Sequence, residues 1–427
     1  MEKEKLKRSI SRLGFSLLAI NGLIGAGIFV LPAAAAEAGG LFSPWMFLIC
    51  GLLMATVILS FSMLASYFRG TGGPVVYANE AFGPAVAFQT GWLLYLGRVT
   101  ALAANANALA IYLTLLWPAL AEGWWHQVII VCAILILTGS NIYGVKKAMS
   151  FVGLITFLKV TPLIIFILWG LPHLELNALF STSDFSTQAV GSSMILLVYA
   201  FIGFEGAVIP AGEAKNPTRD IPRALIQTLV FTTILYMLIQ AVSISLVDNL
   251  SESDAPLSQA SSVLFGNSGF IIMTMVACIS IFGNLSSIFV AAPRMTYALA
   301  NENSLPAWFS KVDEKYQVPI NSIYFMAGFA LVLAISGSFV WLAIISSLAR
   351  MIGYAICLSS LVVIRKKFDQ AKDIYRLPFG LLIPAIAFGI CLWLAFQASW
   401  GSWLLTAGFI ILGAFLYHLN KRITIIL

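Results

Sequence analysis

The chain has 427 residues, of which 60% are hydrophobic and only 10% are charged. The mean hydropathy is +0.94, and soluble domains contain about 25% charged residues, so this composition excludes an ordinary soluble domain. The formal net charge is +6. Because the basic residues are distributed over separate short connections instead of one cluster, a nucleic-acid-binding surface is also excluded.

Twelve apolar stretches follow one another along the chain. Each is long enough for a membrane-spanning helix, which needs about 20 residues. The connections between them are short, so we expect one domain over residues 1–427 embedded in a lipid bilayer. The stretches lie at 13–36, 44–67, 85–116, 126–144, 150–171, 188–212, 223–247, 267–292, 321–337, 340–364, 379–397 and 401–419.

Basic residues alternate between connections. Of the 24 Lys and Arg residues, all except Arg98, Lys159 and Arg350 lie in the two tails or in every second connection. Because connections rich in Lys and Arg stay on the cytoplasmic side, we expect a multi-pass protein with both termini in the cytoplasm. The expected location is the plasma membrane, which is the inner membrane in a Gram-negative bacterium.

Two of the stretches carry glycines near their middle. The first stretch reads Asn-Gly-Leu-Ile-Gly-Ala-Gly-Ile-Phe over 21–29, and the sixth reads Tyr-Ala-Phe-Ile-Gly-Phe-Glu-Gly over 199–206. Broken backbone at membrane depth is tolerated only where protein buries it or where it lines a water-filled cavity. A pair of broken helices in corresponding halves is typical of the binding site of a transporter.

The positions of these breaks predict an all-α fold with an internal repeat. Stretches one to five (13–171) and six to ten (188–364) form two five-helix repeats, in which helices 1 and 6 are discontinuous. An odd number of helices per repeat inverts the second copy in the membrane. We therefore expect twelve transmembrane helices, arranged as a 5+5 inverted repeat with two additional helices (379–419).

A broken helix presents free backbone groups in the middle of the membrane. One half-helix ends with free carbonyls and a partial negative charge, and the next begins with free N–H groups and a partial positive charge. The N–H groups of Gly25 to Ile28 would bind a carboxylate, and the carbonyls of Tyr199 to Ile202 would bind an ammonium group. The two breaks thus predict a site for a zwitterion. The alternative is that the glycines only allow close helix packing.

Five motifs occur in order between residues 14 and 306. Each motif alone is degenerate, but together they resemble those of one transporter family. They are Gly25-Ala26-Gly27-Ile28-Phe29, Gly72-Gly73-Pro74, Phe157-Leu158-Lys159-Val160, Phe201-Ile202-Gly203-Phe204-Glu205-Gly206 with its continuation Gly212-Glu213-Ala214-Lys215-Asn216-Pro217, and Pro293-Arg294-Met295. The chain resembles the APC family, the amino acid–polyamine–organocation transporters.

The resemblance implies the LeuT-type fold and secondary transport of an amino acid by alternating access, through proton-coupled symport or amino acid exchange. It implies that Gly25 to Gly27 bind the substrate carboxylate, while the backbone carbonyls of Leu23, Tyr199 and Ile202 bind its amine. The residues expected at the substrate site are Leu23, Ile24, Gly25, Ala26, Gly27, Tyr199, Ala200, Phe201, Ile202, Gly203, Glu205 and Ile288.

Ile288 bears on the side chain that the site prefers. Relatives that exchange arginine and agmatine carry an aromatic residue at this position, and its absence here favours a neutral, apolar amino acid. The alternative is a polyamine or cationic amino acid antiporter on the same fold. An enzyme is not expected, since the chain has no His-Glu-x-x-His pattern and no intramembrane acid pair. Neither a cofactor nor a metal is predicted.

Glu205 and Lys159 lie deep inside apolar stretches, where ionisable residues usually mark functional sites. The first hypothesis for Glu205 is proton binding or gating, and the alternative is a structural clamp on the broken backbone. The resemblance implies that Lys159 replaces the sodium ion of sodium-coupled members of the fold, so that a proton and not sodium is the coupling ion. Alternatively, Lys159 is a permanently charged strut that binds carbonyls of the first stretch.

Two arginines also lie inside apolar stretches. Arginine keeps its proton at physiological pH, so Arg98 is not expected to carry protons. It is expected to be a structural charge paired with Glu205, or else to bind a carboxylate. Asn105 and Asn107, further along the same stretch, are expected to line the same route. Arg350 receives no predicted role.

Overall fold

The computed structural model describes residues 11–68, 72–143, 148–174, 187–209, 214–368, 374–377 and 379–426. Gly212 and Glu213 of the fourth motif lie outside these ranges, as do the connection residues Arg69, Lys146 and Lys147.

The described residues fold into helices joined by short turns. The first seven α-helices are α1 (Arg12–Leu23), α2 (Gly27–Gly39), α3 (Ser43–Tyr67), α4 (Pro74–Phe82), α5 (Pro84–Leu116), α6 (Trp125–Ile142) and α7 (Ala148–Gly170). The others are α8 (Thr187–Val198), α9 (Glu205–Val208), α10 (Pro217–Leu246), α11 (Pro256–Asn301), α12 (Ile320–Ser336), α13 (Phe339–Lys367), α14 (Leu382–Phe396) and α15 (Trp400–Ile426). Short 3₁₀ turns include η5 (Tyr199–Phe201), which follows α8.

Helix starts follow from the local sequence. The helices α3, α4, α5, α10 and α11 each have a proline in their first turn, where the missing N–H costs no hydrogen bond. Ser11 caps α1 by accepting a hydrogen bond from the N–H of Gly14, and Ser338 caps α13 in the same way. Proline and serine therefore mark several of the points at which the chain enters the bundle.

The described helices identify a multi-pass membrane protein. Eight helical segments are long and apolar enough to cross a membrane. Shorter apolar helices accompany them, namely Arg12–Leu23, Ser193–Val208, Ile320–Ser336 and Leu382–Phe396. Each of the twelve apolar stretches in the sequence contains helix in its described part.

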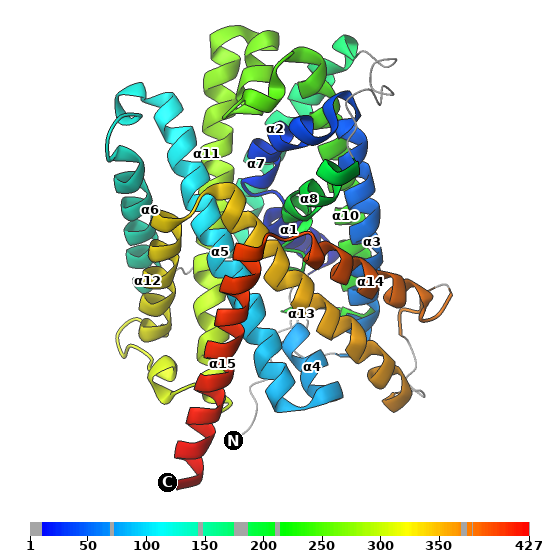
Figure 1. Cartoon of the computed structure of the whole chain (residues 1–427), viewed down its shortest axis with the longest axis vertical. Helices are drawn as coiled ribbons and strands as arrows, with labels where there is room; N and C mark the ends of the chain where they lie inside the picture. Colours follow the sequence, from blue (N-terminus) through cyan, green and yellow to red (C-terminus); the bar gives the residue numbers. More distant parts are fainter. Residues whose placement is uncertain are drawn as a thin grey trace.

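The long helix α5 runs through the middle of the bundle (Figure 1) and packs against α11 and α13. In the most apolar 18-residue part of α5 and of α13, 72% of the residues are buried, compared with 28% in α15. Arg98 on α5 and Arg350 on α13 are buried, while α15 presents much of its surface outward. In Figure 1, α4 and the C-terminal end of α15 lie at the lower end of the molecule.

Both predicted breaks are present. Helix α1 ends at Leu23 and α2 begins at Gly27, which leaves residues 24–26 outside regular helix. The second break separates η5, which ends at Phe201, from α9, which begins at Glu205. A further irregularity occurs in α11 at Gly266, whose φ of +64° divides a short first segment from the long part of the helix. This position agrees with the predicted start of the eighth stretch at 267.

Candidate functional site

The two breaks touch each other through their backbones. A Cβ atom at Gly22 would lie 2.8 Å from the carbonyl oxygen of Gly203, and one at Gly203 would lie 2.5 Å from that of Gly22. Gly203 also has a φ of +121°, which favours glycine. These two glycines therefore serve close packing, as the alternative interpretation proposed, and they bring the two breaks side by side.

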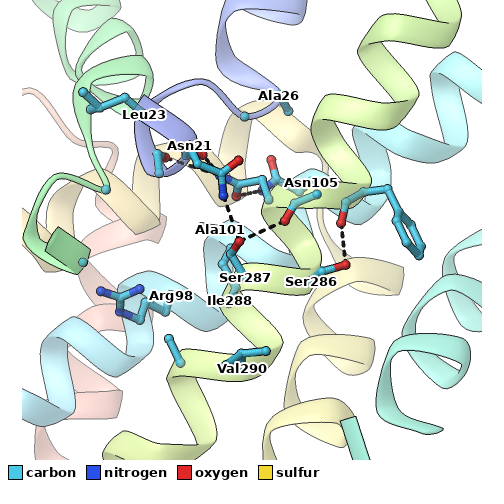
Figure 2. Close-up of a pocket in the computed structure, with 18 of the residues that line it drawn as sticks. Asn21, Leu23, Ala26, Arg98, Ala101, Asn105, Ser286, Ser287, Ile288 and Val290 are labelled. Atoms are coloured by element: carbon cyan, nitrogen blue, oxygen red, sulfur yellow. Dashed lines mark hydrogen bonds between the residues drawn. The ribbon is translucent and has the colours of Figure 1, made fainter. Parts of the chain in front are cut away.

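A cavity of about 820 Å³ lies beside the paired breaks (Figure 2). Its wall includes most of the predicted substrate-site residues together with Arg98. These are Leu23, Gly25, Ala26, Gly27, Tyr199, Ile202, Gly203 and Ile288. The wall does not include Ile24, Ala200, Phe201, Glu205 or Lys159, all of which are buried. The placement of these residues does not support direct contact with a substrate.

The free backbone groups of the first break face this region. The first N–H groups of α2 have no acceptor within the helix, whereas the N–H of Gly25 donates to the carbonyl of Leu23 at 3.1 Å. Gly25 to Gly27 lie in the cavity wall. Of the carbonyls predicted to bind an amine, that of Leu23 accepts a hydrogen bond from the hydroxyl of Tyr236 at 3.1 Å. It also accepts from the N–H of Gly25 at 3.1 Å. Both lone pairs are therefore occupied, and an ammonium group would have to displace one of these donors.

Lys159 lies outside the cavity wall and binds the C-terminal end of α1. Its ammonium group donates to the side-chain oxygen of Asn21 at 2.8 Å, to the backbone oxygen of Asn21 at 3.2 Å and to that of Ile24. The hydroxyl of Ser280 donates to the carbonyl of Gly25 at 3.2 Å. The positive charge thus sits at the negative end of the α1 dipole, as both hypotheses for Lys159 require.

Three asparagines and a tyrosine connect the first break to the cavity. The side-chain amide of Asn284 donates to the carbonyl of Gly22 at 3.3 Å, and its oxygen accepts from Asn105 at 2.8 Å. Asn105 in turn accepts from the hydroxyl of Tyr199 at 3.0 Å. Asn21 donates to Ser287 at 3.0 Å, on the cavity side. This polar network joins α1, α5, η5 and α11, while Asn107 lies outside the wall and donates to the carbonyls of Ala103 and Ala334.

Glu205 anchors the second break to neighbouring helices. One carboxylate oxygen accepts from the N–H of Gly203 at 3.0 Å and from the hydroxyl of Tyr354 at 2.8 Å. The other lies 3.2 Å from Nε of Arg350 and 3.6 Å from Nη2 of Arg98. The predicted Arg98–Glu205 pair is therefore present. Since two guanidinium groups balance one carboxylate, these contacts favour the structural clamp over proton binding by Glu205.

The cavity extends to one side of the breaks. Its wall contains Leu18 before the first break, residues 286–288 of α11, and Ser140 and Asn141 near the end of α6. On the opposite side of the breaks, the ring of Tyr199 packs against that of Phe339, with 5.7 Å between the ring centroids. The hydroxyl of Tyr112 donates to the carbonyl of Phe29 at 2.7 Å. Aromatic contacts therefore close the bundle on the side away from the cavity.

Comparison with known proteins assigns this architecture to a family. Residues 10–417 match the family described as amino acid permease. This chain belongs to the amino acid permease family. The resemblance to the APC transporters is thus confirmed over nearly the whole chain, and the protein is a transporter, not an enzyme.

Individual relatives of this permease cover its full length at low identity. It is 26% identical to the methylthioribose transporter of Bacillus subtilis, over 99% of this chain and 95% of that protein. It is 23% identical to the branched-chain amino acid permease of the same bacterium, over 98% of this chain and 94% of that protein. Identity to the serine/threonine exchanger of B. subtilis is 28%, over 90% of each chain. These relatives support the family and leave the solute of this permease open.

Several residues of the permease site carried no predicted role. Asn284, Ser280 and Ser287 lie on α11, and Arg350 and Tyr354 lie on α13. Their signal in the sequence is a polar or charged side chain within an apolar stretch. Among the described residues, no three His, Cys, Asp or Glu side chains come together as a metal site would require.

Proposed function

We propose that this permease is a secondary amino acid transporter that works by alternating access. The observation that carries the proposal is the pair of touching helix breaks beside one cavity, which presents N–H groups and carbonyls to the same space. The chain would form twelve transmembrane helices, as two inverted five-helix repeats (13–171 and 188–364) with two added helices (379–419). It would lie in the plasma membrane with both termini in the cytoplasm.

The two ends of an amino acid match the two kinds of backbone group. The substrate carboxylate would bind the N–H groups of Gly25 to Gly27, where the α2 dipole is positive. The ammonium group would bind the carbonyls of Leu23, Tyr199 and Ile202. In the predicted topology the cavity faces the cytoplasm, and closure there with opening at Tyr199–Phe339 would complete the transport cycle.

Proton coupling is proposed to act through Lys159. All three of its acceptors are neutral oxygens of Asn21 and Ile24, so loss of the proton would leave no unpaired negative charge there. Asn21 also contacts Ser287 at the cavity, which gives Lys159 a path of contacts to the substrate site. Symport of an amino acid with a proton follows if Lys159 cycles its proton, and exchange follows if it does not.

The charges argue against the amine or polyamine alternative. Arg98 and Arg350 both line the cavity, and like charges repel across a medium of low dielectric constant. A dication such as putrescine would therefore bind poorly. The apolar part of the wall, which includes Ile288, accommodates an aliphatic side chain of an amino acid.

Counterflow in proteoliposomes tests this function. Vesicles containing the purified permease are preloaded with single amino acids or with putrescine, and entry of one labelled amino acid is followed. We expect acceleration by preloaded amino acids and none by putrescine. Acceleration by putrescine alone would establish the amine alternative, and the absence of flux with every amino acid would contradict the proposal.

A further inference from the structure

The Glu205 cluster holds more positive than negative charge. Arg350 and Arg98 both contact the same carboxylate oxygen of Glu205, at 3.2 and 3.6 Å. The other oxygen is bound by Tyr354 and by the N–H of Gly203. Glu205 thus has a partner at each oxygen without Arg98. Two guanidinium groups and one carboxylate leave one positive charge in excess.

Arg98 is the member of this cluster with unused hydrogen-bond donors. Arg350 donates to the carbonyl of Gly97 at 2.9 Å and to the hydroxyl of Ser346. By contrast, Nε and Nη2 of Arg98 are buried and donate no hydrogen bond to any residue that the structure describes. The Arg98 side chain is only 9% exposed. Glu205 balances part of the charge of Arg98, and a second anion would supply acceptors for its unused donors.

Arg98 is also placed where a substrate can meet it. Figure 2 shows it in the cavity wall together with Asn21, Asn105 and Ile288. Within the described part of the chain, the residues that form the wall include two arginines and no Asp or Glu. Glu205 contacts both arginines from outside the wall, so the wall keeps one positive charge in excess, which an anionic substrate would balance.

Arg98 lies on the same helix as a residue of the polar network at the breaks. Asn105 contacts the polar network at the breaks, and Arg98 precedes it by seven residues, which is about 10 Å of helix. Ala101 lies between them and also lines the cavity. An amino acid whose α-carboxylate binds Gly25 to Gly27 can extend its side chain along α5 towards the guanidinium.

We propose that Arg98 binds the side-chain carboxylate of the substrate, so that the permease selects acidic amino acids. This inference rests on the proposed function and narrows its substrate class to amino acids with a net charge of −1. It replaces the neutral, apolar preference that Ile288 alone suggests, because a buried guanidinium with unused hydrogen-bond donors discriminates more strongly than one aliphatic contact. Glutamate and aspartate are the representatives of this class.

The test compares acidic amino acids with their neutral isosteres in the wild-type permease. Proteoliposomes are preloaded with glutamate, glutamine, aspartate or asparagine over a range of concentrations, and uptake of labelled glutamate is followed. We expect glutamate and aspartate to half-saturate counterflow at a concentration about tenfold or more below that of their amides. Equal potency of each acid and its amide, or counterflow by the amides alone, would overturn the proposal.

The variant Arg98→Gln assigns the preference to this side chain. We expect the ratio of glutamate to glutamine potency to fall about tenfold in this variant. Arg294→Gln is the matched control, because it removes an exposed arginine of α11 that is outside the cavity wall, and its ratio should stay at the wild-type value. An unchanged ratio in folded Arg98→Gln would overturn the assignment.

Failure of this inference differs from failure of the transport function. Counterflow driven by neutral amino acids would refute the role of Arg98 and support amino acid transport. If Arg98→Gln does not yield folded protein, the wild-type comparison of acids with amides still decides the substrate class. No counterflow with any amino acid would overturn both proposals.

Discussion

The two helix breaks are stabilised by opposite kinds of charge. At the first break, the carbonyl end of α1 binds the ammonium group of Lys159, whose three acceptors are all neutral oxygens. At the second break, the carboxylate of Glu205 binds the N–H of Gly203 and is balanced by Arg98 and Arg350. Each charge complements the dipole of the helix end that it contacts.

We propose that this difference separates a site that exchanges a proton, at the first break, from one that does not, at the second. Lys159 can become neutral without leaving an unpaired anion, and lysine changes its protonation readily when it is buried. The second break depends on two arginines, which keep their protons, and on the carboxylate of Glu205 that contacts both of them. In this proposal, the first break undergoes the proton-linked change, and the second break stays anchored throughout the transport cycle.

The largest expected effect comes from removing the anchor of the second break. Glu205→Gln leaves two buried guanidinium groups without an anion, and breaking a buried ion pair in this way costs about 3–5 kcal/mol. We expect a large loss of folded permease, measured as the midpoint of thermal unfolding and the monodisperse yield in detergent.

The control for this change is Glu80→Gln. Glu80 pairs with Lys367 at the surface, where the Lys367 side chain is 55% exposed, and such pairs contribute about 1 kcal/mol or less. Its unfolding midpoint should stay close to that of the wild type. A Glu205→Gln protein as stable as this control would contradict the anchoring role.

The next effect concerns the first break. Lys159→Met keeps a side chain of similar length and removes the exchangeable proton, so we expect an inward proton gradient to produce no accumulation of substrate above equilibrium. Uptake in proteoliposomes at several external pH values measures this. Lys311→Met is the control, since Lys311 is exposed. Accumulation with the wild-type pH dependence in Lys159→Met would reduce the lysine to a structural strut.

The smallest expected effect lies between the two breaks. Tyr199→Phe removes the hydrogen bond from the Tyr199 hydroxyl to Asn105 and keeps the ring that packs on Phe339. One hydrogen bond contributes about 1 kcal/mol, so we expect roughly a fivefold rise in the half-saturating substrate concentration. Tyr324→Phe, at a half-exposed position on α12, should show no change. A larger loss in Tyr199→Phe would indicate that the hydroxyl contacts the substrate directly.

The sequence predicted the parts of this site that depend on local backbone preference. Glycines at 25, 27 and 203 weaken helices wherever they occur, and both breaks lie at these residues. Two buried opposite charges need each other, so the pair of Arg98 and Glu205 was also predictable. The order of the helices along the chain was predictable for a similar reason, because each apolar stretch of membrane-spanning length is a local feature of the sequence.

The remaining features depend on contacts between distant segments. Arg350 binds Glu205, which is 145 residues away in the sequence. Asn284 binds the carbonyl of Gly22, which is 262 residues away. Whether Gly22 and Gly203 pack on each other or bind substrate is also decided by how the two breaks meet. No local pattern contains this information, because side-chain partners in a bundle are set by how the helices pack.

The central claim is that an amino acid binds between the two breaks. An experimental structure of the permease in lipid nanodiscs, with the amino acid that gives the fastest counterflow, tests it most directly. We predict that the α-carboxylate lies at the N–H groups of Gly25 to Gly27 and the ammonium group at the carbonyls of Leu23, Tyr199 and Ile202. A substrate bound elsewhere, with both breaks unoccupied, would contradict the account.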